Sequence, residues 1–157
     1  MTEQQQVSDD GVMTRIGQAT MLLHGGDREE ARNRFGELWG QIGPDGDPLH
    51  RCTLAHYMAD AQDDPDAELA WDLRALLAAE ELNEERLATH DSAVALRALY
   101  PSLHLNLAAD YLKLQRLDAA RIHLDRARVA SDSLDDDGYG NGVRAAIERL
   151  EVRLGAR

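Results

Sequence analysis

Three pairs of alanines recur along the chain at one spacing of 12 residues: Ala19 with Ala31, Ala55 with Ala67, and Ala108 with Ala120. A large apolar residue follows each second alanine after four positions: Phe35, Trp71 and Leu124. A small residue on one helix lets the backbone of the next helix approach closely, and a larger residue one turn on fills the space beside it. The spacing therefore predicts three antiparallel helix pairs, each with an apolar side that only a neighbouring pair can cover.

Apolar residues that recur every three or four positions place these helices along the chain. They predict helix pairs over about 12–43, 48–79 and 101–131, and a last, capping helix over about 140–154. Residues 80–100 lack a clear period and predict an irregular insertion that stops before Pro101, while the polar residues 1–11 predict a disordered tail. The predicted fold class is all-α, with stacked antiparallel helix pairs in a single domain over residues 12–157.

The composition narrows the class of protein. A chain of 157 residues can bury a core without disulfides, and its one cysteine, Cys52, excludes an internal disulfide. Acidic residues number 29 against 17 basic ones, and the net charge of −12 disfavours binding to nucleic acid or to an anionic membrane surface. The chain has neither an apolar run of about 20 residues nor the pattern of a signal peptide, so we expect a cytoplasmic protein.

The third predicted pair carries the most specific pattern of residues: His104, Leu107-Ala108, Tyr111, Leu117, Ala120, Leu124 and Ala127. This pattern resembles the tetratricopeptide repeat, a helix-turn-helix unit of about 34 residues with large and small residues at set positions. The first two pairs match more loosely, through Ala19, Leu22, Ala31, Phe35 and Pro44, and through Leu54-Ala55, Met58, Ala67 and Trp71. The chain looks similar to small bacterial proteins of this type. The resemblance implies a TPR-like α-solenoid of about three pairs plus a C-terminal capping helix.

The resemblance also implies a binding surface, because the first helix of each tetratricopeptide pair lines a concave groove that commonly takes a peptide. Carried over to this chain, the groove residues are Thr20, His24, Cys52, His56, Asp60, Asn106 and Lys113. Asn106 resembles the groove asparagines that hold a peptide backbone or a terminal carboxylate. We therefore expect a non-catalytic adaptor that binds a peptide or helix of a partner protein. The excess of carboxylates favours a basic or amphipathic segment.

A second hypothesis rests on the spacing of Cys52, His56 and Asp60. Residues four apart share one face of a helix, so a thiolate, an imidazole and a carboxylate could bind a transition metal or a small ligand, with His24 or His104 as a fourth ligand. The competing interpretation is structural: Cys52 packs as a small hydrophobe, His56 is hydrogen-bonded and Asp60 is solvated. We favour the structural interpretation, and therefore expect no metal and no cofactor.

A catalytic function has no support in the motifs of the chain. The sequence contains no Gly-x-Ser-x-Gly, no His-Glu-x-x-His and no phosphate-binding Walker loop. We therefore do not expect an enzyme. A third hypothesis is self-assembly into a homo-oligomer, through the last helix or the exposed edge of the first pair.

Overall fold

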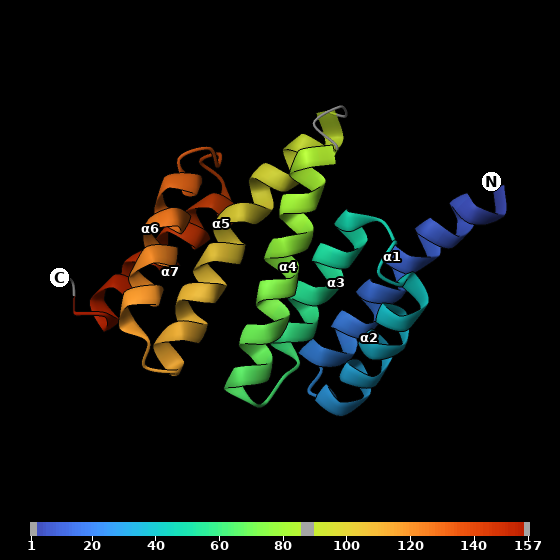
Figure 1. The fold of residues 1–157 in the computed structure, drawn as a ribbon, viewed down its shortest axis with the longest axis horizontal. Helices are drawn as coiled ribbons and strands as arrows, with labels where there is room; N and C mark the ends of the chain where they lie inside the picture. Colours follow the sequence, from blue (N-terminus) through green and yellow to red (C-terminus); the bar gives the residue numbers. More distant parts are fainter. Residues whose placement is uncertain (1–2, 86–89, 156–157) are drawn as a thin grey trace.

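The computed structural model describes residues 3–85 and 90–155 of the chain. Its helices are α1 (Glu3–His24), α2 (Arg28–Ile42), α3 (Pro48–Asp60), α4 (Pro65–Glu85), α5 (His90–Lys113), α6 (Leu117–Ser131) and α7 (Gly138–Arg153) (Figure 1). No strand occurs among the described residues, which confirms the all-α prediction. Within those same ranges, every helix is too short or too polar to cross a lipid bilayer.

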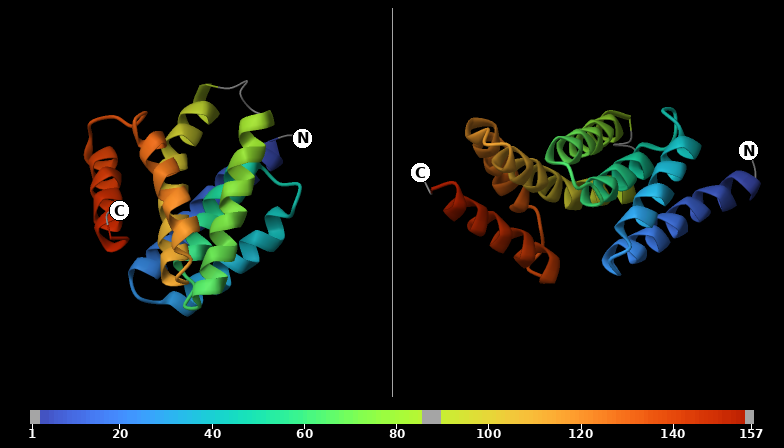
Figure 2. Two further views of the ribbon diagram at one scale, coloured as in Figure 1. Left: turned by 60° about the vertical axis from the view of Figure 1, so that its left-hand side comes forward. Right: turned by 90° about the horizontal axis from the view of Figure 1, so that it is seen from below.

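The helices form a row in chain order, and each packs on the next along the chain. The two ends of the chain lie at opposite ends of this row (Figure 2). The predicted pairs correspond to α1 with α2, α3 with α4, and α5 with α6, and the predicted last helix corresponds to α7. Contacts also link α5 to α7 and α1 to α3, so helices that are not consecutive in the chain also pack on one another.

The repeated alanines lie where helices touch, as their spacing predicted. Five of the six are fully buried, and Ala67 is the partly exposed exception. The larger residues that follow them also enter the core, with Phe35 fully buried and Leu124 nearly so. A fully buried aliphatic or aromatic side chain contributes about 1.5–3 kcal/mol relative to an exposed one, so these positions carry much of the stability.

Three clusters of buried apolar residues follow one another along the row, and aromatic residues connect them. Trp39 and Trp71 pack against both the first and the second cluster, with ring centroids 5.0 Å apart in an edge-to-face arrangement. Tyr111 packs against both the second and the third cluster. These large rings therefore join neighbouring parts of the core.

Four helices begin beside an aspartate whose carboxylate accepts a hydrogen bond from a backbone N–H of the first turn. These bonds run to Asp27 from Glu30, to Asp47 from Leu49, to Asp64 from Ala67 and to Asp137 from Gly140. Such caps satisfy N–H groups that have no partner within the helix. Each of these aspartates therefore helps to fix where its helix begins.

Two predicted boundaries are wrong. Helix α1 begins at Glu3, so residues 3–11 are helical where a disordered tail was expected, because glutamate and glutamine are good helix formers. The expected irregular insertion over 80–100 is largely helical, because α4 extends to Glu85 and α5 begins at His90. Residues 86–89 of the insertion lie outside the described part. Residues 1–2 of the predicted tail and residues 156–157 of the predicted domain lie outside it as well.

Helix α5 also continues through Pro101, where a stop was expected. A proline inside a helix lacks the N–H donor, and its ring crowds the carbonyl group four residues earlier, so such a helix benefits from outside contacts near the proline. The Tyr139 hydroxyl donates to the Ala98 carbonyl at 2.7 Å, and it also contacts the Ser102 hydroxyl. This contact from α7 supports α5 around the proline.

Candidate functional site

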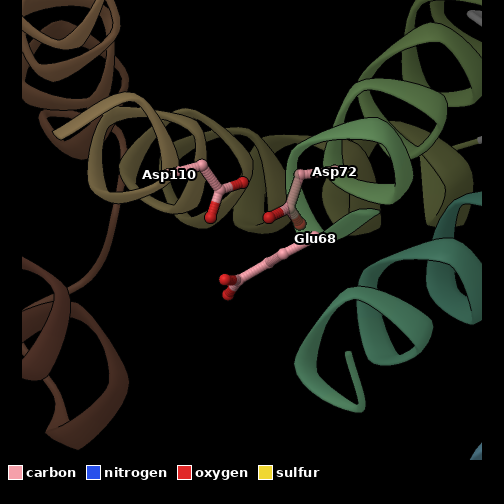
Figure 3. Close-up of side chains that lie close together, drawn as sticks. All are labelled: Glu68, Asp72 and Asp110. Atoms are coloured by element: carbon pink, nitrogen blue, oxygen red, sulfur yellow. The ribbon is translucent and has the colours of Figure 1, made fainter. Parts of the chain in front are cut away.

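Three carboxyl groups converge where α4 meets α5 (Figure 3). Glu68 and Asp72 lie one turn apart on α4, and Asp110 comes from α5. One oxygen from each carboxyl group lies within 4.8 Å of those from the other two. We call these three residues the carboxylate cluster. Asp72 is 2% exposed and Asp110 is 1% exposed, whereas Glu68 is only partly buried, so solvent reaches the cluster on the Glu68 side.

The two aspartates of the cluster are short of hydrogen-bond donors. Their side chains point toward one another (Figure 3). Asp72 Oδ1 and Asp110 Oδ2 are buried and have no hydrogen-bond partner. Lys113, the only lysine of the chain, donates from Nζ to Glu68 Oε1 at 2.7 Å. The nearest ammonium group therefore compensates Glu68 and leaves the aspartate pair without a bonded cation.

Burial changes the acidity of this pair. It raises the pKa of Asp72 to about 11, and the neighbouring Asp110 raises it further. Burial also raises the pKa of Asp110, to about 6. Two carboxyl groups at hydrogen-bonding distance resist double ionisation, because each negative charge destabilises the other in a poorly solvated place. The protein with nothing else bound therefore keeps a proton on this pair at neutral pH.

Four of the seven residues predicted to line a groove lie on α3 and α5, the two helices that pack against α4 and its part of the carboxylate cluster. Asn106 Nδ2 lies 3.2 Å from His56 Nδ1, which links α5 to α3. Asp60 is near enough for its charge to raise the pKa of Asp72, and Lys113 is bonded to Glu68. Burial lowers the pKa of His56, which favours the neutral imidazole. His24 is exposed at the end of α1, where its charge acts on Asp60.

The other predicted groove residues do not present free groups there. Cys52 is fully buried in the core formed by α3, α4 and α5, and burial raises the pKa of its thiol to about 12. The thiol therefore packs as part of the apolar core, as the structural interpretation of Cys52 describes. The Thr20 hydroxyl donates to the Ile16 carbonyl of its own helix at 2.8 Å.

A pocket of about 360 Å³ lies on the other side of Asn106, between α5 and α7. Its lining residues are Leu105, Asn106, Ala109, Ala146, Arg149, Leu150 and Arg153. Arg149 and Arg153 are exposed, and neither makes a hydrogen bond or an ion pair with any residue that the structure describes. Two unpaired guanidinium groups on so acidic a chain make this a locally basic site.

The proposed fourth metal ligand, His104, has a different partner. Its Nδ1 lies 3.0 Å from Nδ1 of His123, and the two rings stack in a series between Tyr100 and Tyr111. Burial lowers the pKa of His104 to about 4, and the charge of His123 lowers it further. At least one of the two imidazoles must be neutral to accept the hydrogen bond.

The carboxylate cluster was missed, although the sequence contains a signal for it. Asp72 lies between Leu69 and Leu76 on the apolar stripe of α4, and Asp110 follows Leu107 on that of α5. Aspartate is almost never fully buried without a partner, so a carboxylate at a core position of a helix indicates a special environment. The tetratricopeptide resemblance places groove residues on the first helix of each pair, and Glu68 and Asp72 lie on α4, a second helix.

No family model matches the chain, and neither a curated protein nor a solved structure matches it. The tetratricopeptide resemblance therefore depends on the residues of the helix pairs alone. The function has to be inferred from the chemistry of the surface that α3, α4, α5 and α7 present.

Proposed function

We propose that this chain is a non-catalytic interaction module, built from degenerate tetratricopeptide-type helix pairs, that binds a segment of a partner protein beside α5. The single observation that carries the proposal is the pocket between α5 and α7, where Arg149 and Arg153 lie unpaired beside Asn106. The buried alanines of the three helix pairs support the repeat part of the proposal.

The lining of the pocket indicates what the partner segment presents. A guanidinium group binds a carboxylate through two parallel hydrogen bonds, and an asparagine amide can both donate to and accept from a peptide backbone. The apolar part of the wall, which includes Leu105 and Leu150, suits an aliphatic side chain. The fitting partner is an amphipathic segment with an acidic side chain or a terminal carboxylate next to an apolar residue.

The proposed class of partner segment is more specific than the class expected from the sequence. The excess of acidic residues favoured either a basic or an amphipathic segment. A basic segment would meet two guanidinium groups in the pocket, and like charges at short distance oppose binding. The proposal that the module is non-catalytic rests on the surroundings of two potentially reactive side chains, the thiol of Cys52 and the imidazole of His56. Cys52 is sealed in the core as a thiol, and His56 contacts Asn106.

Selection from a random peptide library tests the proposal. The immobilised protein should enrich peptides that share an aliphatic residue beside an acidic residue or a free carboxyl end. A synthetic peptide of that sequence should shift the side-chain amide signals of Asn106 in an NMR spectrum. The paired change Arg149→Glu and Arg153→Glu should weaken binding at least tenfold, since it replaces attraction by repulsion.

Arg116→Glu is the matched control, because Arg116 is an exposed arginine at the start of α6 and does not line the pocket. This variant should bind like the wild type. The proposal fails if no peptide is enriched. It also fails if the selected peptides bind equally well after the paired change in the pocket.

A further inference from the structure

We infer that Glu68, Asp72 and Asp110 form a binding site for one divalent cation of the calcium type, placed at the joint between the second and third helix pairs. The proposal concerns residues that the partner pocket does not use. It starts from the two buried oxygens, Asp72 Oδ1 and Asp110 Oδ2, that have no hydrogen-bond partner and belong to side chains 2% and 1% exposed. A buried polar atom without a partner is costly, and a ligand that bonds it recovers that cost.

The size of the cluster fits such an ion. Calcium binds carboxylate oxygens at 2.3–2.6 Å, so two ligands on opposite sides of the ion lie roughly 4.8 Å apart. The three ligand oxygens lie within 4.8 Å of one another, so they can reach one calcium ion with little movement of the helices.

The chemistry of the donors fits a hard cation and excludes a larger cationic group. All three ligands are carboxylates, which calcium prefers and soft transition metals do not. With Lys113 bonded to Glu68, three carboxylates and one ammonium leave a formal charge of −2, which a divalent ion balances. Both aspartates are buried and Glu68 is only partly buried, so a ligand has to be small enough to reach their oxygens beside Glu68.

The location of the cluster gives the ion a mechanical role. Asp72 belongs to α4 and Asp110 to α5, and these helices form the contact between the second and third helix pairs. An ion bonded to both would join the two pairs and hold α5, and with it Asn106, in one orientation. Cation binding should therefore raise the unfolding temperature of the whole chain.

A proton is the competing occupant. The pKa of Asp72 is raised by burial, by Asp110 and by the charges of Asp60 and Glu68, so the pair holds a proton when no cation is bound. Lys113 acts in the opposite direction on Asp110, and burial lowers the pKa of His56 on α3. A cation must displace the proton, so its affinity should fall as the pH falls from 7.5 to 5.5.

Calorimetric titration of the full chain with calcium chloride, after removal of metals with a chelator, tests the inference at pH 7.5. The expected result is one ion per chain, with release of about one proton that is counted by repeating the titration in buffers of different ionisation enthalpy. The paired change Asp72→Asn and Asp110→Asn should weaken binding at least tenfold and abolish the rise in unfolding temperature. Circular dichroism confirms that this variant folds.

Asp132→Asn with Asp136→Asn is the matched control, since it removes the same charge from exposed positions of the loop before α7. It should leave the affinity within about twofold. Lys113→Met should strengthen calcium binding several-fold, because it removes a competing positive charge. The inference would be overturned if the wild type bound no calcium up to millimolar concentration and kept the proton on Asp72 and Asp110. That result would show that a proton alone occupies the aspartate pair. Equal binding by the wild type and the Asp72→Asn, Asp110→Asn variant would overturn it as well.

Discussion

Asp72 on α4 and Asp110 on α5 face each other across the joint between the second and third helix pairs, and both side chains are almost completely buried. Apolar residues surround them along each helix, so the core at this joint contains two acids that cannot both ionise without cost. The free energy of unfolding should therefore depend on whether a proton or a cation neutralises Asp72 and Asp110.

The first prediction concerns the pair in the absence of divalent cations. Asp110→Asn should raise the free energy of unfolding by about 1–2 kcal/mol at pH 7, because the amide can donate to Asp72 and the change removes the buried charge that Asp110 carries at this pH. The folded-state pKa of Asp110, about 6, lies above the ordinary value of 3.8, so its contribution to stability is full below pH 3.8 and is lost as the pH rises through 6.

Urea unfolding in the presence of a chelator measures this effect at pH 7 and at pH 4. The gain from Asp110→Asn should shrink at pH 4, where the wild-type carboxyl group is already protonated. Asp125→Asn, at an exposed position of α6, is the control and should change the stability by less than about 0.5 kcal/mol. A loss of stability at pH 7 in the Asp110→Asn variant would contradict the interpretation of the pair.

The second prediction concerns His104. Its folded-state pKa of about 4 lies below the ordinary 6.5, so the unfolded chain takes up a proton first and stability falls as the pH falls from 6.5 toward 4. His104→Phe keeps an aromatic ring between Tyr100 and His123 but cannot titrate. Between pH 7 and pH 5 this variant should lose about 1–2 kcal/mol less stability than the wild type.

Denaturant unfolding at the two pH values gives the comparison, with His24→Gln at an exposed position as the control. The groups that face His104 are His123 and the positive Arg126, and both disfavour an added proton on it. If His104→Phe and the wild type lose the same stability between pH 7 and pH 5, His104 is not held neutral by the fold.

The third prediction concerns the close contact of paired helices. Ala108 on α5 is fully buried in the same cluster as Ala120 of α6. Ala108→Leu should lower the free energy of unfolding by about 1–3 kcal/mol, because the added methyl and methylene groups have no room between the helices. Ala145→Leu, on the exposed face of α7, should change it by less than about 0.5 kcal/mol, and equal effects of the two changes would refute the packing argument.

The fourth prediction concerns the start of α7. The Asp137 carboxylate accepts a hydrogen bond from the Gly140 backbone N–H at 2.8 Å. Asp137→Ala should cost about 1 kcal/mol of stability through loss of this cap. Asp136→Ala removes a neighbouring charge at an exposed position without a cap and should have little effect. Thermal unfolding of both variants decides whether the cap or the general acidity of the loop matters.

The helix pairs could be predicted because their signals are local. A 12-residue spacing between Ala108 and Ala120 encodes a turn of known length and a close helix contact, and Asp27 before a helical stripe marks a start. The continuation of α5 through Pro101 could not be predicted in this way. It depends on Tyr139, 38 positions later in the sequence, whose hydroxyl supports the helix from α7.

The candidate site was predicted in part, for a related reason. His56, Asn106 and Lys113 lie on first helices of pairs, where the resemblance placed a groove; Lys113 bonds to Glu68 of the carboxylate cluster, and Asn106 contacts His56. Asp72 lies on a second helix, and only the packing of α4 on α5 brings it to Asp110. Cys52 shared the helical spacing of His56, but the depth of α3 in the core decided its burial, and spacing along one helix does not encode that depth.

The most direct test of the account is an NMR titration of the side-chain carboxyl carbons of Asp72 and Asp110 in the metal-free protein. The account predicts that these two signals titrate together, that Asp110 changes near pH 6, and that the pair still holds one proton at pH 7. Titration of both Asp72 and Asp110 below pH 4.5 would contradict a buried, face-to-face pair.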